Sequence, residues 1–207
     1  GADIEAQTRF GATPLQIAIL QEKTELLDTL LAKNPDLSVR TASDHTILHL
    51  AVINEEISIV KKLMNKLLLG DKDETSLLSE KEREEGNERK NTMIRARDDS
   101  GRTALHYATN REMVLELLRN NIEIDAQDNH GETALHRALK NNNMELVRTL
   151  VLGNANTTLP NKDGKTAADL AQEFGLAEEF EEVRNSVIVV ENPQGYPLAG
   201  LLQNQQA

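Results

Sequence analysis

The chain has 207 residues, a formal net charge of −11 and only 2% aromatic residues, with no Trp. This length allows one domain or at most two, and a hydrophobic content of 39% is enough for a buried core. Because binding to a phosphate backbone requires a basic surface, the acidic balance argues against nucleic acid as a partner. Leu, Ile, Val and Ala must supply most of the buried surface, which favours closely packed helices over a sheet with aromatic cross-strand pairs.

Cysteine usage and hydropathy exclude further classes of protein. The sequence contains no Cys, which rules out disulfides and thiol catalysis. No apolar run approaches the ~18 residues that cross a bilayer, and no signal peptide opens the chain. We therefore expect no membrane insertion and an intracellular, cytoplasmic location.

A six-residue motif recurs five times along the chain. It is found at Thr13–Ala18, Thr46–Ala51, Thr103–Ala108, Thr133–Ala138 and Thr166–Ala171, and the spacings from Thr to Thr are 33, 57, 30 and 33 residues. A period near 33 residues that begins with T-P-L-H-x-A resembles the ankyrin repeat. The resemblance covers residues 1–184 and implies an all-α solenoid, in which stacked helix-turn-helix units are joined by β-hairpin loops. Residues 1–7 lack an initial Met and resemble the closing loop of a preceding repeat, so we expect a piece of a longer protein.

The first predicted repeat spans residues 8–40. The Thr13 hydroxyl can cap its first helix, and Pro14 stands at the first helical position, where a missing N–H has no cost. Its second helix is expected to bury one apolar face made of Leu26, Leu27, Leu30 and Leu31. The second repeat, 41–97, places Ile59, Val60, Leu63 and Met64 at the same offsets, which predicts that the helices stack in parallel layers.

An insertion of 24 residues interrupts the second repeat, at about residues 69–92. Ser79 and Glu82 fit a capping box, which allows a short exposed helix. Because Leu77 and Leu78 are its only apolar anchors between 71 and 91, we favour a solvated, partly disordered excursion. The alternative is a contact or regulatory element specific to this protein.

The remaining repeats differ in regularity. The third, 98–127, is three residues short near Asn110, which should tilt or shorten its first helix, whereas the fourth, 128–160, is regular. In the fifth, 161–184, Glu179 and Arg184 enter a face that other repeats keep apolar, as a terminal capping repeat requires. The tail, 185–207, contains a run of four β-branched residues, and it is either a strand or arm on the last repeat or a linker.

No residue pattern indicates catalysis. The same motif position is occupied by His49, His106 and His136. Because these residues belong to different layers, they are too far apart to share a metal ion. Each is instead expected to form a hydrogen bond with the backbone at the start of its helix and to connect its loop to the next one. Phosphate-loop, nucleophile-elbow, zinc-protease and calcium-loop motifs are absent. We therefore predict no enzyme, no catalytic residue, no cofactor and no metal.

The resemblance places partner binding on the concave face that the hairpin tips and first helices form. Carried over by register, the partner-binding positions are Phe10, Leu20, Gln21, His45, Ile53, Asn54, Arg102, Arg111, His130 and Lys140. Apolar groups at the first two repeats beside a polar to basic middle suit a protein or peptide with an apolar anchor and acidic residues. Alternatively, Leu20 and Ile53 pack on neighbouring helices and Phe10 covers a terminus.

The function predicted from the sequence is that of a non-enzymatic, monomeric protein–protein interaction module that displays a rigid surface. One alternative is a targeting or regulatory region of a larger enzyme, or of an effector that an intracellular microbe delivers into the host cytosol. Another alternative is a purely structural spacer.

Overall fold

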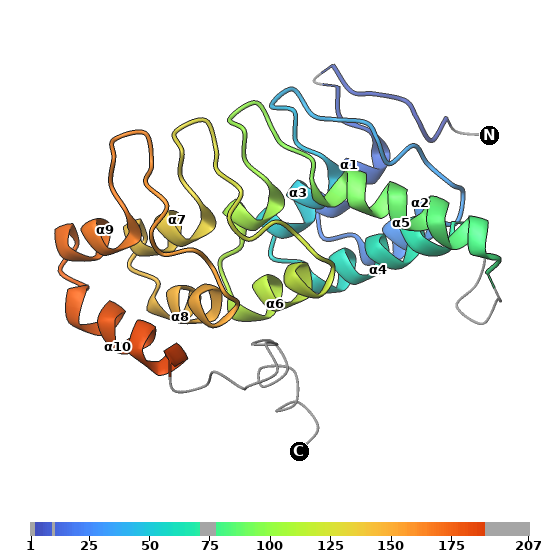
Figure 1. The fold of residues 1–207 in the computed structure, drawn as a ribbon. Helices are drawn as coiled ribbons and strands as arrows, with labels where there is room; N and C mark the ends of the chain where they lie inside the picture. The colour runs from blue at the N-terminus through green and yellow to red at the C-terminus, as the bar shows by residue number, and fades with distance from the viewer. Residues whose placement is uncertain (1–2, 10, 71–77, 189–207) are drawn as a thin grey trace. The chain divides into compact units, whose positions relative to one another are not determined.

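The computed structural model describes residues 3–9, 11–70 and 78–188, with backbone alone for 187 and 188. Within these ranges it contains ten α-helices, one short 3-10 helix and no strand (Figure 1). The elements are α1 Pro14–Leu20, α2 Thr24–Leu31, α3 Ile47–Ile53, α4 Ile57–Leu69, α5 Glu80–Ile94, η1 Ala104–Tyr107, α6 Arg111–Arg119, α7 Ala134–Lys140, α8 Met144–Leu152, α9 Ala167–Glu173 and α10 Ala177–Ile188. The predicted all-α repeat architecture is confirmed.

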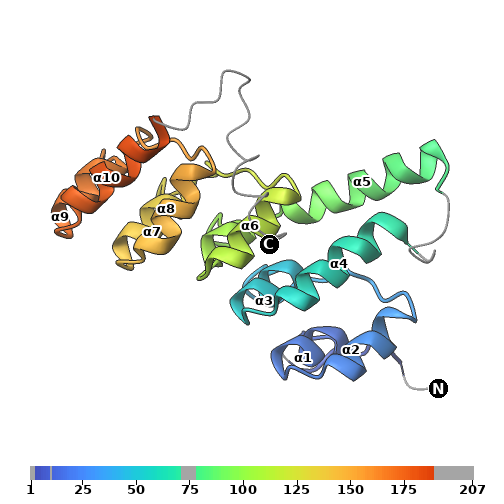
Figure 2. The same cartoon turned by 90° about the horizontal axis from the view of Figure 1, so that it is seen from below.

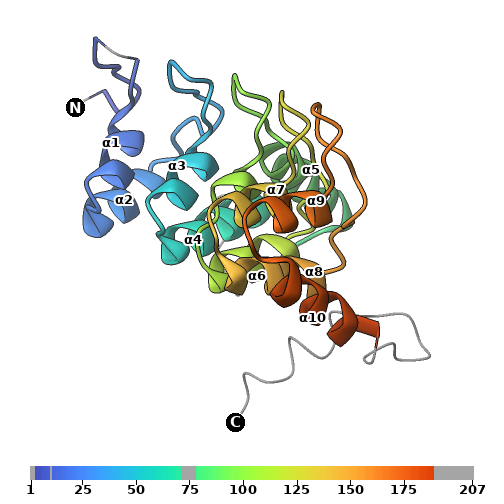
Figure 3. The same ribbon diagram turned by 90° about the vertical axis from the view of Figure 1, so that its left-hand side faces the viewer.

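The chain divides into two compact units. The N-terminal unit comprises residues 1–108 and 119–122, and the C-terminal unit comprises 109–118 and 123–207. In the N-terminal unit α1 packs on α2 and α3, and α3 packs on α4 and η1 (Figure 3). In the C-terminal unit α7 packs on α8 and α9, and α10 packs on α8 and α9. Each unit therefore has a layer of first helices beside the hairpin loops and a layer of second helices behind it.

Each motif begins its helix in the same way. Thr13, Thr46, Thr103, Thr133 and Thr166 are the N-caps, and each forms a capping box with the residue three positions later. In this arrangement the Thr hydroxyl and the side chain at the third helical position satisfy two backbone N–H groups that a helix start leaves open. Pro14 stands at the start of α1, as predicted.

The second helices supply most of the core, with one departure from prediction. Leu27, Val60, Val147 and Phe180 are each at most 1% exposed at the same offset from their Thr. The prediction that Leu26 lies on the buried face is wrong: its side chain is 47% exposed, because no described segment covers that side of α2. The other three Leu positions predicted for this helix are buried.

The third repeat is shortened in the predicted place. Its first helix is a single 3-10 turn, η1, and Ala108 then takes an extended conformation with ψ 131°. In the other repeats the turn between the two helices contains a residue with positive φ, namely Glu22, Glu55, Asn142 and Gly175. The deletion removes this left-handed residue, so the chain leaves the helix one turn earlier.

The insertion differs from the preferred expectation. Its described part forms α5, a continuous helix of 15 residues that begins with the predicted Ser79–Glu82 capping box. The expectation of a partly disordered excursion is therefore wrong for residues 80–92 of the insertion, and residues 71–77 lie outside the described ranges. Figure 2 shows α5 running alongside α4.

Close backbone approach explains how this polar helix docks. Gly86 is buried, and a Cβ there would lie 2.2 Å from the carbonyl oxygen of Leu68. Arg89 Nε donates to the carbonyl oxygen of Leu67 at 3.3 Å, and Met93 and Ile94 are buried at the end of the helix. A glycine contact and two apolar residues thus replace the apolar stripe that the sequence lacks.

At the C-terminal end α10 continues to Ile188, four residues into the predicted tail. Residues 189–207, where the alternatives of an arm or a linker apply, lie outside the described ranges. The predicted repeat and tail boundaries stay predictions.

Candidate functional site

The hairpin loops are rigid because side chains bridge their bases. In the third, fourth and fifth repeats Asp98, Asp128 and Asn161 each accept, through Oδ1, the N–H groups of the residues two and four positions later at 2.8–3.0 Å. In the first two repeats Thr8 and Thr41 accept one N–H each through the hydroxyl. Loops tied in this way present their tips in a fixed conformation.

Neighbouring loops also bind each other inside each unit. In the C-terminal unit the Lys162 N–H donates to the carbonyl oxygen of His130 at 2.9 Å. Gly131 permits this approach, because it has φ 72° and a Cβ there would lie 2.8 Å from the Lys162 nitrogen. In the N-terminal unit the Asp99 N–H donates to the carbonyl oxygen of Ser43 at 3.4 Å.

Two apolar side chains lie exposed on the inner helices of the N-terminal unit. Leu20 ends α1 and Ile53 ends α3, at the same offset from their capping Thr, and they are 49% and 39% exposed. Since α1 packs directly on α3, the two lie on adjacent layers. Both side chains therefore keep a large exposed part, and neither is fully covered by neighbouring helices. Of the residues that follow them, Gln21 is exposed and Asn54 is half-buried. Phe10 lies outside the described ranges.

A polar cluster connects the second and third hairpins of the same unit. Tyr107 Oη donates to Asp98 Oδ2 at 2.5 Å, and His45 Nε2 lies 3.4 Å from that same oxygen. The Arg102 guanidinium lies over the Tyr107 ring, 5.8 Å from its centroid, and the His45 ring meets that ring edge-on. Two predicted positions, His45 and Arg102, are thus brought together around a tyrosine.

Burial and hydrogen bonding set the charges in this cluster. Burial raises the pKa of Asp98, but hydrogen bonds from Tyr107 and from the N–H groups of Arg102 and Ser100 outweigh it, so the net pKa lies below the usual value. Burial and the bond to Asp98 raise the pKa of Tyr107. At neutral pH the cluster therefore holds an aspartate and a neutral tyrosine.

Predicted positions in the C-terminal unit behave differently. Lys140 at the end of α7 forms an ion pair with Glu132 in its own hairpin. In the next repeat the charges are reversed: Lys165 lies in the hairpin and pairs with Glu173 at the end of α9, at 2.6 Å. The predicted partner-binding cation at 140 is therefore already neutralised within the chain. Arg111 and His130 are exposed.

Residues that the sequence analysis missed belong to two kinds of position. Asp98, Asp128 and Asn161 stand five residues before the motif Thr, a regularity that the register could have revealed. Tyr107 occupies the variable motif position and carries no sequence signal, whereas the register places Glu132 in the fourth hairpin without predicting its pairing with Lys140. Only the spatial neighbours of these two side chains identify them.

The three motif histidines have the predicted structural role at the starts of their helices. Nδ1 of His49 and of His136 accepts the N–H of the capping Thr at 3.2 Å, and Nε2 donates to a carbonyl of the next hairpin, on Arg102 and Lys165. His106 Nδ1 accepts the Thr103 N–H at 3.1 Å. Among the described residues no three His, Asp or Glu are grouped so that they could hold a metal ion.

None of the described helices combines the length and the apolar character that crossing a membrane requires.

Comparisons with known proteins agree with this architecture. Two family models match, one described as ankyrin repeats (3 copies) over residues 1–76 and one as ankyrin repeats (many copies) over residues 112–171. The chain is also similar to Protein glp-1 of Caenorhabditis elegans, with 31% identity over 198 residues. That similarity covers 83% of this chain and 15% of the relative, so the chain spans a small part of the relative's length.

Proposed function

Since the chain belongs to the ankyrin repeat family, we propose that it is a non-enzymatic module that binds a partner protein or peptide through its hairpin loops and first helices. Ankyrin repeats are in general protein–protein interaction modules. The finer proposal concerns the surface used, which we place on the N-terminal unit. We name it the inner face and define it by Leu20, Ile53, His45 and Arg102.

One observation carries this choice of surface. In the described part of the chain, the exposed large apolar side chains are Leu20, Leu26, Ile53 and Phe174, and two of these four occupy the same position in adjacent inner helices. Exposed apolar groups that gather beside polar ones are typical of protein-binding surfaces, because their burial contributes most of the binding free energy. The corresponding positions of the fourth and fifth repeats carry the paired Lys140 and Glu173 instead.

The chemistry of the inner face indicates what the partner supplies. Leu20 and Ile53 favour an apolar side chain, and Arg102, half-buried beside Tyr107, favours an acidic residue next to it. Because Lys140 already pairs with Glu132, we do not extend the acidic part of the partner to the C-terminal unit. We propose that the module acts as a monomer in the cytoplasm.

The spacer alternative predicts that the inner face can change without consequence, and one experiment separates the two proposals. The intact chain, a Leu20→Ser, Ile53→Ser variant and a Leu26→Ser variant are immobilised, and proteins captured from lysate are quantified by mass spectrometry. Leu26 is the matched control, because it is as exposed as Leu20 but lies on α2. Circular dichroism first establishes equal helicity.

We expect a partner that the intact chain and Leu26→Ser retain equally, and that the inner-face variant loses by about 10-fold or more, as for the loss of interface anchors. If all three chains retain the same proteins, the inner face is not the binding surface. The alternative of a regulatory region of a larger enzyme would be supported by a catalytic motif in a longer form of the protein.

A further inference from the structure

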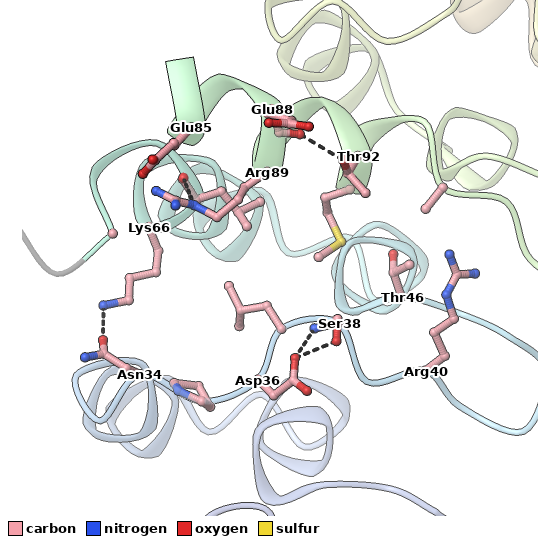
Figure 4. A pocket seen from close by; sticks show the side chains of 16 residues that line it. Asn34, Asp36, Ser38, Arg40, Thr46, Lys66, Glu85, Glu88, Arg89 and Thr92 are labelled. Atoms are coloured by element: carbon pink, nitrogen blue, oxygen red, sulfur yellow. Dashed lines mark hydrogen bonds between the residues drawn. The ribbon is translucent and has the colours of Figure 1, made fainter. Parts of the chain in front are cut away.

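A hollow of about 670 Å³ lies in the N-terminal unit (Figure 4), and none of the four residues that define the inner face lines it. One wall is α5, the opposite wall is the loop that follows α2, and the end of α4 closes it from behind. The hollow exists because the insertion adds a helix to the second repeat. Its volume is within the range of about 300–1,000 Å³ that is usual for ligand pockets.

Both walls are held in place by specific contacts. On one side Gly86 touches the backbone of Leu68, and Arg89 Nε donates to the carbonyl oxygen of Leu67. On the other side Asp36 Oδ1 accepts from the N–H and hydroxyl of Ser38 at 2.8 and 2.6 Å, and the Asp36 N–H donates to Glu5. The hollow is therefore preformed, which lowers the entropic cost of binding.

The floor is apolar and the rim is charged. Leu37, Leu67 and Met93 line the interior. At one end Lys66 Nζ donates to Asn34 Oδ1 at 2.5 Å, so its position is fixed across the gap between α4 and the loop (Figure 4).

Two adjacent charges on α5 have unused binding capacity. Arg89 uses Nε for its hydrogen bond to the carbonyl oxygen of Leu67. Within the described ranges, its two terminal nitrogens have no hydrogen-bond partner. One of them, Nη2, lies close to Gly70 at the end of α4, 3.6 Å from the position that a Cβ on this glycine would take. The neighbouring Glu88 accepts a bond from Thr92 through its backbone, whereas its carboxylate pairs with no described side chain. A fixed guanidinium fork favours a carboxylate, and a free carboxylate favours a cation.

We propose that this hollow binds a short segment of a partner protein in which one apolar side chain lies between an acidic and a basic residue. The apolar side chain enters between Leu37, Leu67 and Met93, the acidic group pairs with Arg89 and the basic group with Glu88. The opposite charges of this pair argue against a simple anion or a fatty acid as the occupant. The site is lined by α5, the end of α4 and the loop after α2, and none of the four residues that define the inner face lines it.

The test uses the full chain and a positional-scanning library of acetylated, amidated heptapeptides. Peptides that bind are expected to share an acid, a Leu- or Met-sized residue and a base, and the selected peptide is then titrated by fluorescence anisotropy. Arg89→Glu should weaken its binding by about 10-fold or more. A peptide with its acid replaced by Lys should regain affinity for Arg89→Glu.

Three further variants make the result unambiguous. Thr92→Trp fills the hollow from an exposed position on α5 and should abolish binding, whereas Arg83→Glu changes an exposed charge outside the hollow and should leave it unchanged. The Leu20→Ser, Ile53→Ser variant should also bind normally. The proposal is overturned if no peptide prefers the intact chain to Thr92→Trp, or if Arg89→Glu binds the selected peptide unchanged. Loss of binding only in the inner-face variant assigns the peptide to the other site and leaves the proposed function standing.

Discussion

The fourth residue of the motif links two hairpins through one planar side chain. His49 accepts from its own capping Thr46 and donates to the carbonyl oxygen of Arg102 at 3.0 Å, one loop further along. Gln16 makes the same two bonds with an amide, from the Thr13 N–H and to the carbonyl oxygen of Val39, each at 3.0 Å. The position therefore requires an acceptor and a donor on opposite ends of a rigid group, and imidazole is one solution.

Using imidazole makes stability depend on pH. Burial lowers the pKa of both His49 and His136 below 6.5, although each is bonded to a carbonyl. The unfolded chain then binds more protons than the folded one below pH 6.5, so the stability is complete above this value and is lost as the pH falls through the lower folded pKa values.

We expect the free energy of unfolding, measured with urea, to fall between about pH 7.5 and pH 5.5 in the natural chain. A His49→Gln, His136→Gln variant should keep both pairs of hydrogen bonds, as Gln16 does, and lose most of this pH dependence. Its stability at the higher pH should stay within about 1 kcal/mol of the original. An unchanged pH slope in the double variant would contradict the assignment to these two histidines.

At the scale of single elements, α5 illustrates how tertiary contacts stabilise a largely polar helix without an apolar stripe along its length. Its exposed residues carry both charges, and its contact with α4 depends on a glycine in the middle of the helix. Isolated helices of this length are marginal in water, so the docked state must come from packing as well as from the Ser79 cap.

Gly86→Ala tests this account through the sign of its effect. In a freely exposed helix the change would stabilise by about 1 kcal/mol, because Ala is the better helix former. Here the new Cβ would lie 2.2 Å from a backbone oxygen, so α5 must shift or detach at a cost of about 1–3 kcal/mol. Hydrogen exchange over residues 80–94 should accelerate, while exposed Asn87→Ala as control leaves it unchanged or slower.

For the molecule as a whole, stability in an array comes from each repeat and its direct neighbours. In the C-terminal unit α10 contacts α8 and α9, and its Phe180 is 1% exposed. Phe174, three residues before α10 begins, is 45% exposed. The two phenylalanines, one buried and one exposed, form a matched pair for testing how far a local loss of stability spreads along the array.

Phe180→Ala should destabilise the C-terminal unit by about 3–5 kcal/mol, as usual for a buried aromatic side chain. Hydrogen exchange should rise in α7–α10 and stay unchanged in α1 and α2. Phe174→Ala should alter stability by less than about 0.5 kcal/mol, as expected for a surface change. Equal acceleration along the entire chain after Phe180→Ala would show that the array unfolds as one cooperative body instead.

Much of the fold followed from local sequence. The Thr caps, Pro14 and the phase of the apolar pairs act within one or two turns of helix, so the sequence predicted where the first helices begin and, except for Leu26, which residues α2 buries. The three missing residues near Asn110 similarly predicted a shortened first helix, because removing residues from a turn changes its path. The structural role of the histidines was predicted because the array separates them.

The sequence by itself therefore determined the repeat period, the starts of the first helices, the shortened third repeat and the set of candidate partner-binding positions. Only the tertiary structure decided which of those positions are available: Leu20 and Ile53 are exposed, whereas Lys140 is paired with Glu132. It also decided that α5 docks on α4 and encloses a hollow, and that Tyr107 joins Asp98, His45 and Arg102. These outcomes depend on contacts between segments distant in sequence, and composition and periodicity contain no information about which distant side chains meet.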